Sequence, residues 1–299
     1  MRVVLLFILS IFLFACADEK AAEPRYLAFN TTRDGNFEVY LLDLDSMKLK
    51  NLSEHESTDF GPAFSADGTE VWFYSERDGN REIYYKDLLS GTLFRVTNHP
   101  AKDLNPVPSP QGDKVYFISD REEDGRELFS MNRDGSKIQR ITFNQEYEEA
   151  IAVSPDGKQL AFCRLVAESD TGFANNGEIF IMDINGENER RLTNLPGFQS
   201  GPSFSPDGKK IAFYGEHNEG WDIFILDLET GKIRNFTNDR VEQYSPVWSA
   251  DGKWLAYTEG TAENYDIRIR SLDGAKSKLL TRHPKRDSGP AFFAKHLPF

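Results

Sequence analysis

A short strand-like motif recurs along the chain and constrains its fold more than any other feature. In each copy a branched aliphatic and an aromatic residue stand two positions apart, with first positions at 27, 71, 115, 160, 211 and 255. The successive spacings are 44, 44, 45, 51 and 44 residues. Because residues two apart lie on one face of a strand, each copy is predicted to present a packed face. Such a fixed period indicates a repeat architecture.

Each repeat contains four candidate strands separated by turns rich in Asp, Gly and Asn. A short apolar strand such as 202–204 precedes a Ser-Pro-Asp-Gly turn at 205–208, and the aliphatic–aromatic strand follows. A third strand begins after turns such as Arg-Asp-Gly-Asn at 33–36, and a short fourth strand completes the unit. These turn residues supply positive φ angles and local side-chain caps. Four antiparallel strands in a repeat of roughly 40–45 residues are typical of a propeller blade.

The two ends of the chain complement one another. Continuing the series by one period from 255 predicts a second strand at 299, which is the last residue. The preceding segment, 288–293, matches the first-strand runs at 59–65 and 199–205, whereas residues 26–52 supply three outer strands and no inner one. Joining the ends removes the exposed sheet edges of an open array. We therefore predict an all-β, six-bladed β-propeller of four-stranded antiparallel blades, closed by a C-terminal innermost strand that pairs with the N-terminal blade.

The repeat resembles that of a known family. The run Pro-x-Phe-Ser-Pro-Asp-Gly-Lys at 202–209, its Ile-Ala-Phe continuation at 211–213, and Asp-Gly-Asn-Arg-Glu-Ile-Tyr at 78–84 are similar to the propeller repeat of the TolB family. The resemblance covers the chain after about residue 25. It implies a TolB-like propeller lipoprotein without the separate N-terminal α/β domain that TolB itself carries.

The N-terminal segment has the pattern of an export signal. Arg2 precedes an apolar run that is shorter than the roughly 20 residues needed to span a bilayer, which favours a signal peptide over an anchor helix. Leu13-Phe14-Ala15-Cys16 resembles a bacterial lipobox, whose cysteine is acylated; an ordinary secretory signal is the alternative. We predict a signal peptide at 1–15, a lipidated tether at 16–25 and the propeller at 26–299. Ala17 favours the outer membrane of a bacterial cell envelope.

Charge and motifs limit the classes of function. The formal net charge of −13 argues against nucleic-acid partners, which need clustered Lys and Arg. The sequence contains no GxSxG, HExxH, P-loop or GxGxxG motif, so no catalytic residue and no cofactor are predicted. Cys163 lies in an apolar strand-like run and is predicted to be a buried small hydrophobe.

One polar residue per blade is the candidate ligand site. These residues stand three positions before the proline of each first strand or its equivalent, where they are expected to ring the channel mouth: Asp59, Asp103, Glu148, Gln199, Gln243 and Asp287. Converging carboxylates would concentrate negative potential for a cation, a basic peptide or a polyhydroxylated ligand. The alternative is that these short polar side chains cap the turn that enters the strand.

Further repeated polar residues favour structural roles. The third strands open with acids that are expected to accept backbone hydrogen bonds from a preceding turn or a neighbouring blade: Glu38, Glu82, Glu127, Glu178, Asp222 and Asp266. His55, His99 and His283 follow fourth strands at equivalent positions, which are too far apart for a metal site, so none is predicted. The insertion at 166–177, which lengthens one repeat, is expected on the channel-mouth face.

The leading functional hypothesis is a non-enzymatic binding or scaffold module. It would be tethered to an envelope membrane and would engage a protein or glycan partner through the channel-mouth face. The rival is a glycan lyase or hydrolase built in an acidic channel, and its mark would be two channel carboxylates within about 10 Å, one with a raised pKa. A purely structural envelope protein is the third alternative.

Overall fold

The computed structural model describes residues 25–122, 125–144, 146–166, 176–217, 220–238, 240–261 and 264–293. The predicted signal peptide, Cys16 and most of the tether lie outside the described residues, as does the central part, 167–175, of the predicted insertion. Within the described segments, no helix has the length and apolar character needed to cross a membrane.

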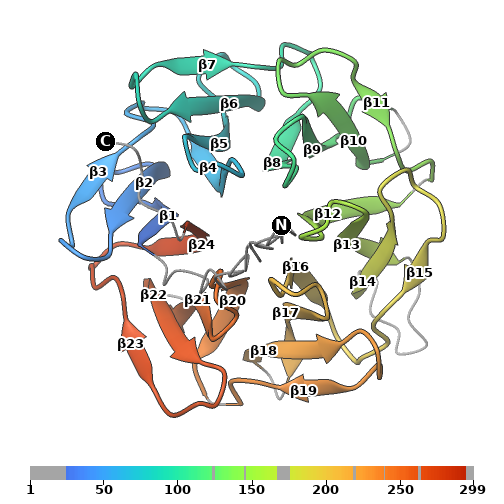
Figure 1. The fold of residues 1–299 in the computed structure, drawn as a ribbon. Helices are drawn as coiled ribbons and strands as arrows, with labels where there is room; N and C mark the ends of the chain where they lie inside the picture. Colours follow the sequence, from blue (N-terminus) through green and yellow to red (C-terminus); the bar gives the residue numbers. More distant parts are fainter. Residues whose placement is uncertain are drawn as a thin grey trace, which may run out of the picture.

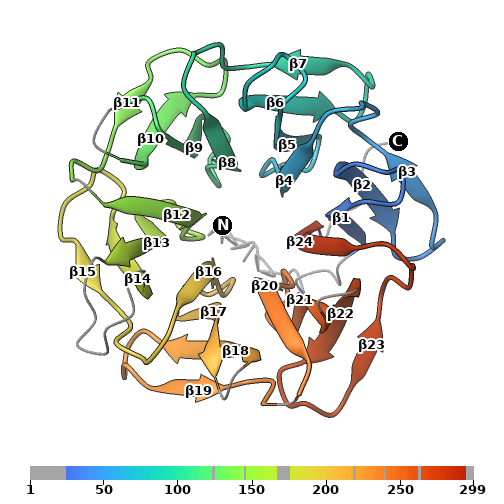
Figure 2. The ribbon, with the colours of Figure 1, turned by 180° about the vertical axis from the view of Figure 1, so that it is seen from behind.

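Six four-stranded antiparallel sheets form a ring around a central channel (Figures 1 and 2). We name them blades A to F in chain order, and give the strands of each blade from the centre outward. Blade A has β24 (Asp287–Phe293), β1 (Tyr26–Thr31), β2 (Glu38–Asp43) and β3 (Leu49–Asn51). Blade B has β4 (Asp59–Phe64), β5 (Glu70–Ser75), β6 (Glu82–Asp87) and β7 (Leu93–Arg95). Blade C has β8 (Asp103–Pro108), β9 (Lys114–Ser119), β10 (Glu127–Asn132) and β11 (Gln139–Arg140).

The second half of the ring repeats the pattern with longer middle strands. Blade D has β12 (Tyr147–Val153), β13 (Gln159–Val166), β14 (Asn176–Asp183) and β15 (Arg190–Arg191). Blade E has β16 (Gln199–Phe204), β17 (Lys210–His217), β18 (Gly220–Asp227) and β19 (Ile233–Asn235). Blade F has β20 (Glu242–Trp248), β21 (Trp254–Thr261), β22 (Asn264–Ser271) and β23 (Ser277–Leu279).

Blade A closes the ring by joining the two ends of the described chain. β24 pairs antiparallel with β1, and Tyr26 stands opposite Phe293 and Leu27 opposite Phe292. Figure 1 shows the red β24 beside the blue β1. The predicted six-bladed fold and its closure by the C-terminal strand are therefore confirmed.

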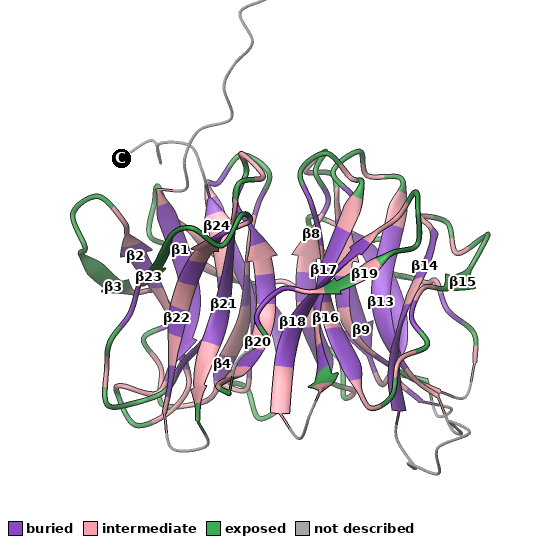
Figure 3. Ribbon diagram, turned by 90° about the horizontal axis from the view of Figure 1, so that it is seen from below, coloured by how far each residue is buried: buried purple, intermediate pink, exposed green. Residues whose placement is uncertain are grey.

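The repeated aliphatic–aromatic strand forms the core between blades. Phe29, Phe73, Phe117, Phe162 and Phe213 on the second strands are all fully buried. They pack into clusters that bring together neighbouring blades, such as the one that joins Val39 of blade A to Phe73 of blade B. Figure 3 shows the second and third strands mostly buried and the connecting turns exposed. Burial of these side chains at every junction stabilises the closed ring.

The ring has two faces. The mouth face carries the turns between second and third strands and the beginnings of the innermost strands. The terminal face carries the beginning of β1 and the end of β24, because Tyr26 pairs with Phe293 while Thr31 pairs with Asp287. The turns between first and second strands and between third and fourth strands lie on the terminal face too, because consecutive strands in each blade are antiparallel.

Candidate functional site: the central channel and its mouth

The six candidate residues of the sequence lie at the beginnings of the innermost strands, on the mouth face. All six side chains are buried, with an exposed fraction of 0%: Asp59, Asp103, Glu148, Gln199, Gln243 and Asp287. None of them is among the residues that line the central cavity. Four acids buried in this way need partners, because an ionised carboxylate without one is costly inside a protein.

In blades A to C the partner is an arginine from the turn between the second and third strands. Arg121 donates from Nη2 to both carboxylate oxygens of Asp103 at 2.8 Å, and its Nε donates to the hydroxyl of Ser119 at 3.0 Å. Arg77 makes the same contacts to Asp59 and Ser75. In blade A the three residues are Arg33, Asp287 and Thr31. Each arginine also stacks on aromatic rings of its own blade.

In blade D the arginine of the corresponding ion pair is shared between two glutamates. Arg164 donates to one oxygen of Glu148 from Nε at 2.9 Å and from Nη2 at 2.8 Å. The same guanidinium binds both oxygens of Glu189, at 2.6 and 2.9 Å. The second oxygen of Glu148 is buried without a hydrogen-bond partner. Burial raises the pKa of Glu148 to about 7, although Asn144 and Arg164 oppose the rise.

Blades E and F replace the acid by an amide. Gln199 donates from Nε2 to the carbonyl oxygen of Gly197 at 2.6 Å and to that of Pro196 at 3.2 Å. It therefore ties down the segment that leads into β16, which is the turn-capping role considered as the alternative. Gln243 of blade F is buried at the equivalent position.

These contacts correct the expected picture of an acidic ring open to the channel. The side chains point into the blades, and the acids among them are held by arginines that the sequence analysis did not assign to them. Their geometry favours a structural role, and a ligand-binding role for the six stays a prediction. The overlooked signal is a Ser or Thr followed two residues later by Arg, at 31–33, 75–77 and 119–121.

The acids that open the third strands anchor the fourth strand of the same blade. Glu82 accepts hydrogen bonds from the hydroxyl of Thr97 at 2.6 Å and from the backbone N–H of His99 at 2.8 Å. The hydroxyl oxygen of Thr97 in turn accepts the backbone N–H of Ile83 at 2.9 Å. The predicted structural role is confirmed here, but the main partners lie in the segment that follows the outer strand. Glu38 also accepts a hydrogen bond from Nδ2 of Asn36 in the preceding turn.

The three equivalent histidines cap turns. His55, His99 and His283 each accept, at Nδ1, the backbone N–H two residues further on, at 3.1 Å. In the described part of the chain, no three His, Cys, Asp or Glu side chains are grouped as a metal site would require.

Cys163 is fully buried, as predicted, and burial raises the pKa of its thiol to about 12, which leaves it unreactive at neutral pH.

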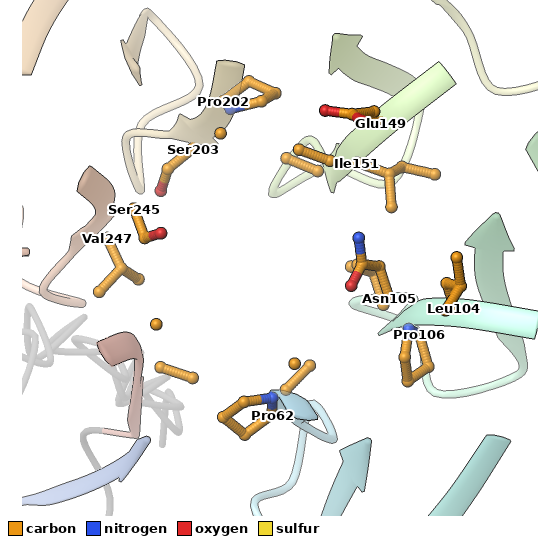
Figure 4. A pocket seen from close by; sticks show the side chains of 18 of the residues that line it. Pro62, Leu104, Asn105, Pro106, Glu149, Ile151, Pro202, Ser203, Ser245 and Val247 are labelled. Atoms are coloured by element: carbon orange, nitrogen blue, oxygen red, sulfur yellow. The ribbon is translucent and has the colours of Figure 1, made fainter. Parts of the chain in front are cut away.

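The central channel holds a cavity of about 650 Å³ that all six blades line through their innermost strands. Figure 4 shows labelled side chains from five blades, including Pro62, Asn105, Ile151, Ser203 and Val247, arranged around an open centre. Most of the lining residues are Pro, Gly, Ala or larger apolar residues, and five of the six innermost strands contribute a proline from the bulge. Small polar side chains are interspersed among them: Asn30, Asn105, Ser200, Ser203 and Ser245. This size lies within the roughly 300–1,000 Å³ of pockets that accept ligands or peptide side chains.

A bulge in each innermost strand shapes the channel wall. One residue per blade has a positive φ: Gly61, Asn105, Ala150, Gly201, Ser245 and Gly289. A proline follows it in every blade except D, and proline suits this position because the bulge leaves its place in the ladder unpaired. The N–H of Gly61 donates to Oδ1 of Asn30 in blade A, so the bulge also ties neighbouring blades together.

Few charged groups line the cavity, and they gather at the mouth. They are Arg81, Arg126 and Glu149, each beside the beginning of a strand on the mouth face. Arg126 lies 3.8 Å from Glu149, and both side chains are about one third exposed, at 30% and 36%. With Glu149 the one carboxylate among the described lining residues, the pair of channel carboxylates expected of a glycan-cleaving enzyme is not found there.

Aromatic side chains line one side of the mouth. The ring centroids of Trp221 and Tyr244 are 5.5 Å apart, those of Tyr214 and Tyr244 are 5.4 Å apart, and Phe198 lies 6.0 Å from Trp221. These four side chains are partly exposed, and Tyr214 reaches the channel cavity. Partly exposed aromatic clusters of this kind are common in protein interfaces.

Comparison with known proteins decides the family. The model of the PD40 family, described as the TolB beta propeller domain, matches residues 21–175 and 164–294. The chain belongs to this family. The TolB-like resemblance expected from the repeat is thereby confirmed for the propeller.

Individual relatives are more distant. A TolB homolog of Chlorobium luteolum is 30% identical over 29% of this chain, and the match spans 28% of that protein. TolB from Acinetobacter baumannii superposes with a TM-score of 0.72 at 23% identity, over 89% of this chain and 66% of that one. A putative TolB from Agrobacterium tumefaciens gives 0.71 at 18% identity, over 91% of this chain and 99% of that one. At these identities the solved structures share the fold alone.

Proposed function

We propose that this protein is a binding or scaffold module of the bacterial cell envelope, tethered by a lipid on Cys16, that captures an envelope protein through the mouth face. The observation that carries the proposal is the apolar channel of about 650 Å³, with Arg81, Arg126 and Glu149 at its mouth. Membership of the TolB propeller family supports an envelope role. A segment of the partner enters the channel, and the mouth residues contact the surface around it.

The chemistry of the lining favours a protein partner over a glycan. A glycan presents hydroxyl groups on all sides and needs many convergent hydrogen-bonding side chains, whereas most of the lining residues here are Pro, Gly, Ala, Val, Ile, Leu or Phe. A peptide segment with apolar side chains can bury its surface against such walls without leaving hydroxyl groups unsatisfied. The partly exposed Trp221 and Tyr244 extend this apolar surface beyond the channel.

The tether fits this arrangement. The chain enters the ring at Tyr26 on the terminal face, so an anchor at Cys16 is attached on the face opposite the mouth. Ten residues from Cys16 to Arg25 reach about 35 Å at most when extended. The mouth therefore remains accessible to partners in the aqueous space next to the membrane.

Photo-crosslinking within the channel tests the proposal. A benzophenone amino acid at Ser203, which lines the channel, should trap a discrete protein adduct in intact cells. The same probe at Gln139, on the outer strand of blade C, should not give this adduct. Filling the channel by Ser203→Trp should remove the adduct from a second mouth probe at Arg126 while leaving the Tm within about 2 °C. An adduct that persists in the filled channel would contradict capture through the channel.

A further inference from the structure

Large exposed apolar side chains are concentrated on one part of the terminal face. Of the seven such side chains in the described residues, five lie in the turns between third and fourth strands or at the adjoining fourth strands of blades A to C. We name this set the apolar rim; its members are Met47, Leu49, Leu89, Phe94 and Ile138, with exposed fractions from 39% to 54%. Exposed apolar residues scattered singly need no explanation, but a set gathered on one sector indicates a contact surface.

The equivalent sector of blades D to F is different. In the register of Phe94 stand Arg190 in blade D, Arg234 in blade E and Lys278 in blade F. In the register of Leu49, blade F has Ser277, and blade E has Ile233, which is only partly exposed. No described residue on that side of the terminal face is a large exposed hydrophobic side chain. Phe94 has a packing role, because its ring stacks on that of Tyr85 with centroids 4.8 Å apart. Since both sectors form the same kind of turn and strand, the fold does not require the other four apolar side chains to be exposed there.

Met47 occupies a backbone position that suits glycine. Its φ is 57°, and the residues at the same place in the turns of blades B and E are Gly91 and Gly231, with φ of 70° and 68°. A left-handed conformation is unfavourable for a side chain with Cβ, so this position costs stability that the glycines avoid.

The apolar rim adjoins the place where the N-terminal segment enters the ring. Tyr26 pairs with Asp43, which begins the turn that carries Met47. The carbonyl oxygen of Arg25 accepts the N–H of Leu44 at 2.8 Å, and the guanidinium of Arg25 binds the carboxylate of Asp45 in the same turn. Arg25, the first described residue, is therefore held directly against this turn.

Lysines stand beside three of the five rim members, and the same turns also carry Asp45, Asp87 and Asp134. Lys48 and Lys50 flank Leu49, and Lys137 precedes Ile138. All three lysines are exposed, and no ion pair is recorded for them among the described residues. Apolar side chains that enter the headgroup region, together with Lys that meets anionic headgroups, are the chemistry by which proteins rest on a lipid surface.

We propose that the apolar rim of blades A to C contacts an anionic lipid bilayer, so that the tethered propeller sits on the membrane through one sector of its terminal face. The orientation inferred here rests on the lipid tether at Cys16 that is part of the proposed function. The contact orients the channel as well as restraining the protein near the membrane. The mouth points away from the bilayer, and because blades D to F are lifted from it, the mouth is tilted toward the side of blades A to C.

Depth-sensitive fluorescence on the full-length, membrane-reconstituted protein tests the inference. A polarity-sensitive dye on Leu89→Cys is compared with the same dye on Ser277→Cys, in vesicles of phosphatidylethanolamine with about 30% phosphatidylglycerol. Doxyl-labelled lipid should quench the dye at position 89 at least about threefold more than the dye at position 277. Met47→Asn combined with Ile138→Thr should reduce that quenching, and Asn suits the left-handed turn position, so folding is retained.

The outcomes separate the rim from the tether. Equal and weak quenching at both positions, in protein that floats with the vesicles, would overturn the rim and leave the tether intact. Protein that fails to float at all would contradict both proposals. Cys16→Ser should weaken flotation strongly, and flotation of this variant that still depends on Met47 and Ile138 would support the rim even if the lipid anchor is wrong.

Discussion

Blades A to C and blades D to F build the same four-stranded unit but hold its innermost strand in different ways. In the first half, the second and third strands have six residues each, and an arginine from the short turn folds back onto a buried aspartate. In the second half these strands have eight residues each, and the buried position holds Glu148, Gln199 or Gln243. The same fold therefore accepts either an aspartate paired with a turn arginine or a longer Glu or Gln side chain at this buried position.

The lengths of the hairpins give a physical reason for the difference. In blades D to F the ladder continues beyond the third-strand acid, for example through the pairs of Glu216 with Trp221 and of His217 with Gly220. These additional backbone bonds support the mouth face directly. In blades A to C the ladder stops at that acid, as at Ser119 and Glu127, and the turn arginine supplies the missing connection. The six buried polar residues thus serve mainly to secure the start of the innermost strand within each blade.

The largest expected effect comes from removing an arginine of the first half. Arg121→Gln leaves Asp103 buried without a countercharge and should lower the free energy of unfolding by about 3–5 kcal/mol. The matched change in the second half, Gln199→Leu, removes no charge and should cost no more than about 2 kcal/mol. Urea denaturation at pH 7 measures both. Equal losses would show that the two halves do not differ in the way described.

A smaller effect concerns the dependence of stability on pH in blade D. Burial raises the pKa of Glu148 to about 7, above the value of about 4.3 for an unfolded chain, so the folded protein binds the proton more tightly. The stability contributed by the protonated form is present below pH 4.5 and is lost as pH rises toward 7. Glu148→Gln should flatten this part of the profile by up to about 3 kcal/mol. An unchanged slope in the variant would contradict the assignment.

The sequence predicted the fold well because the repeated residues are those that form the turns and the buried core. The period, the turn residues and the match of 288–293 to other first strands each required only that equivalent positions fold alike. They sufficed to predict that Leu27 would meet Phe292. Periodicity also located the polar position of every innermost strand, at Asp59 and its equivalents.

The environment of those polar residues could not be predicted in the same way. Whether Asp59 faces the channel or the blade depends on its side-chain direction and on a partner, Arg77, that lies 18 residues away in the chain. The apolar channel also went unpredicted, because the bulge at Gly61 and its equivalents redirects the strand locally. Repeat spacing reports neither of these features, although the Ser/Thr-x-Arg pattern in three blades hints at the first.

A double-mutant cycle on Asp103 and Arg121 tests the central claim most directly, namely that the mouth-face acids hold the innermost strand in place within its own blade. The cycle compares Asp103→Asn, Arg121→Gln and the double variant by urea denaturation, with capture of the channel adduct as a second readout. We expect a coupling of about 2 kcal/mol between the two residues, and adduct formation that persists in the folded double variant. A coupling near zero, with Asp103→Asn folded normally but unable to capture the partner, would make this acid a ligand-binding group instead.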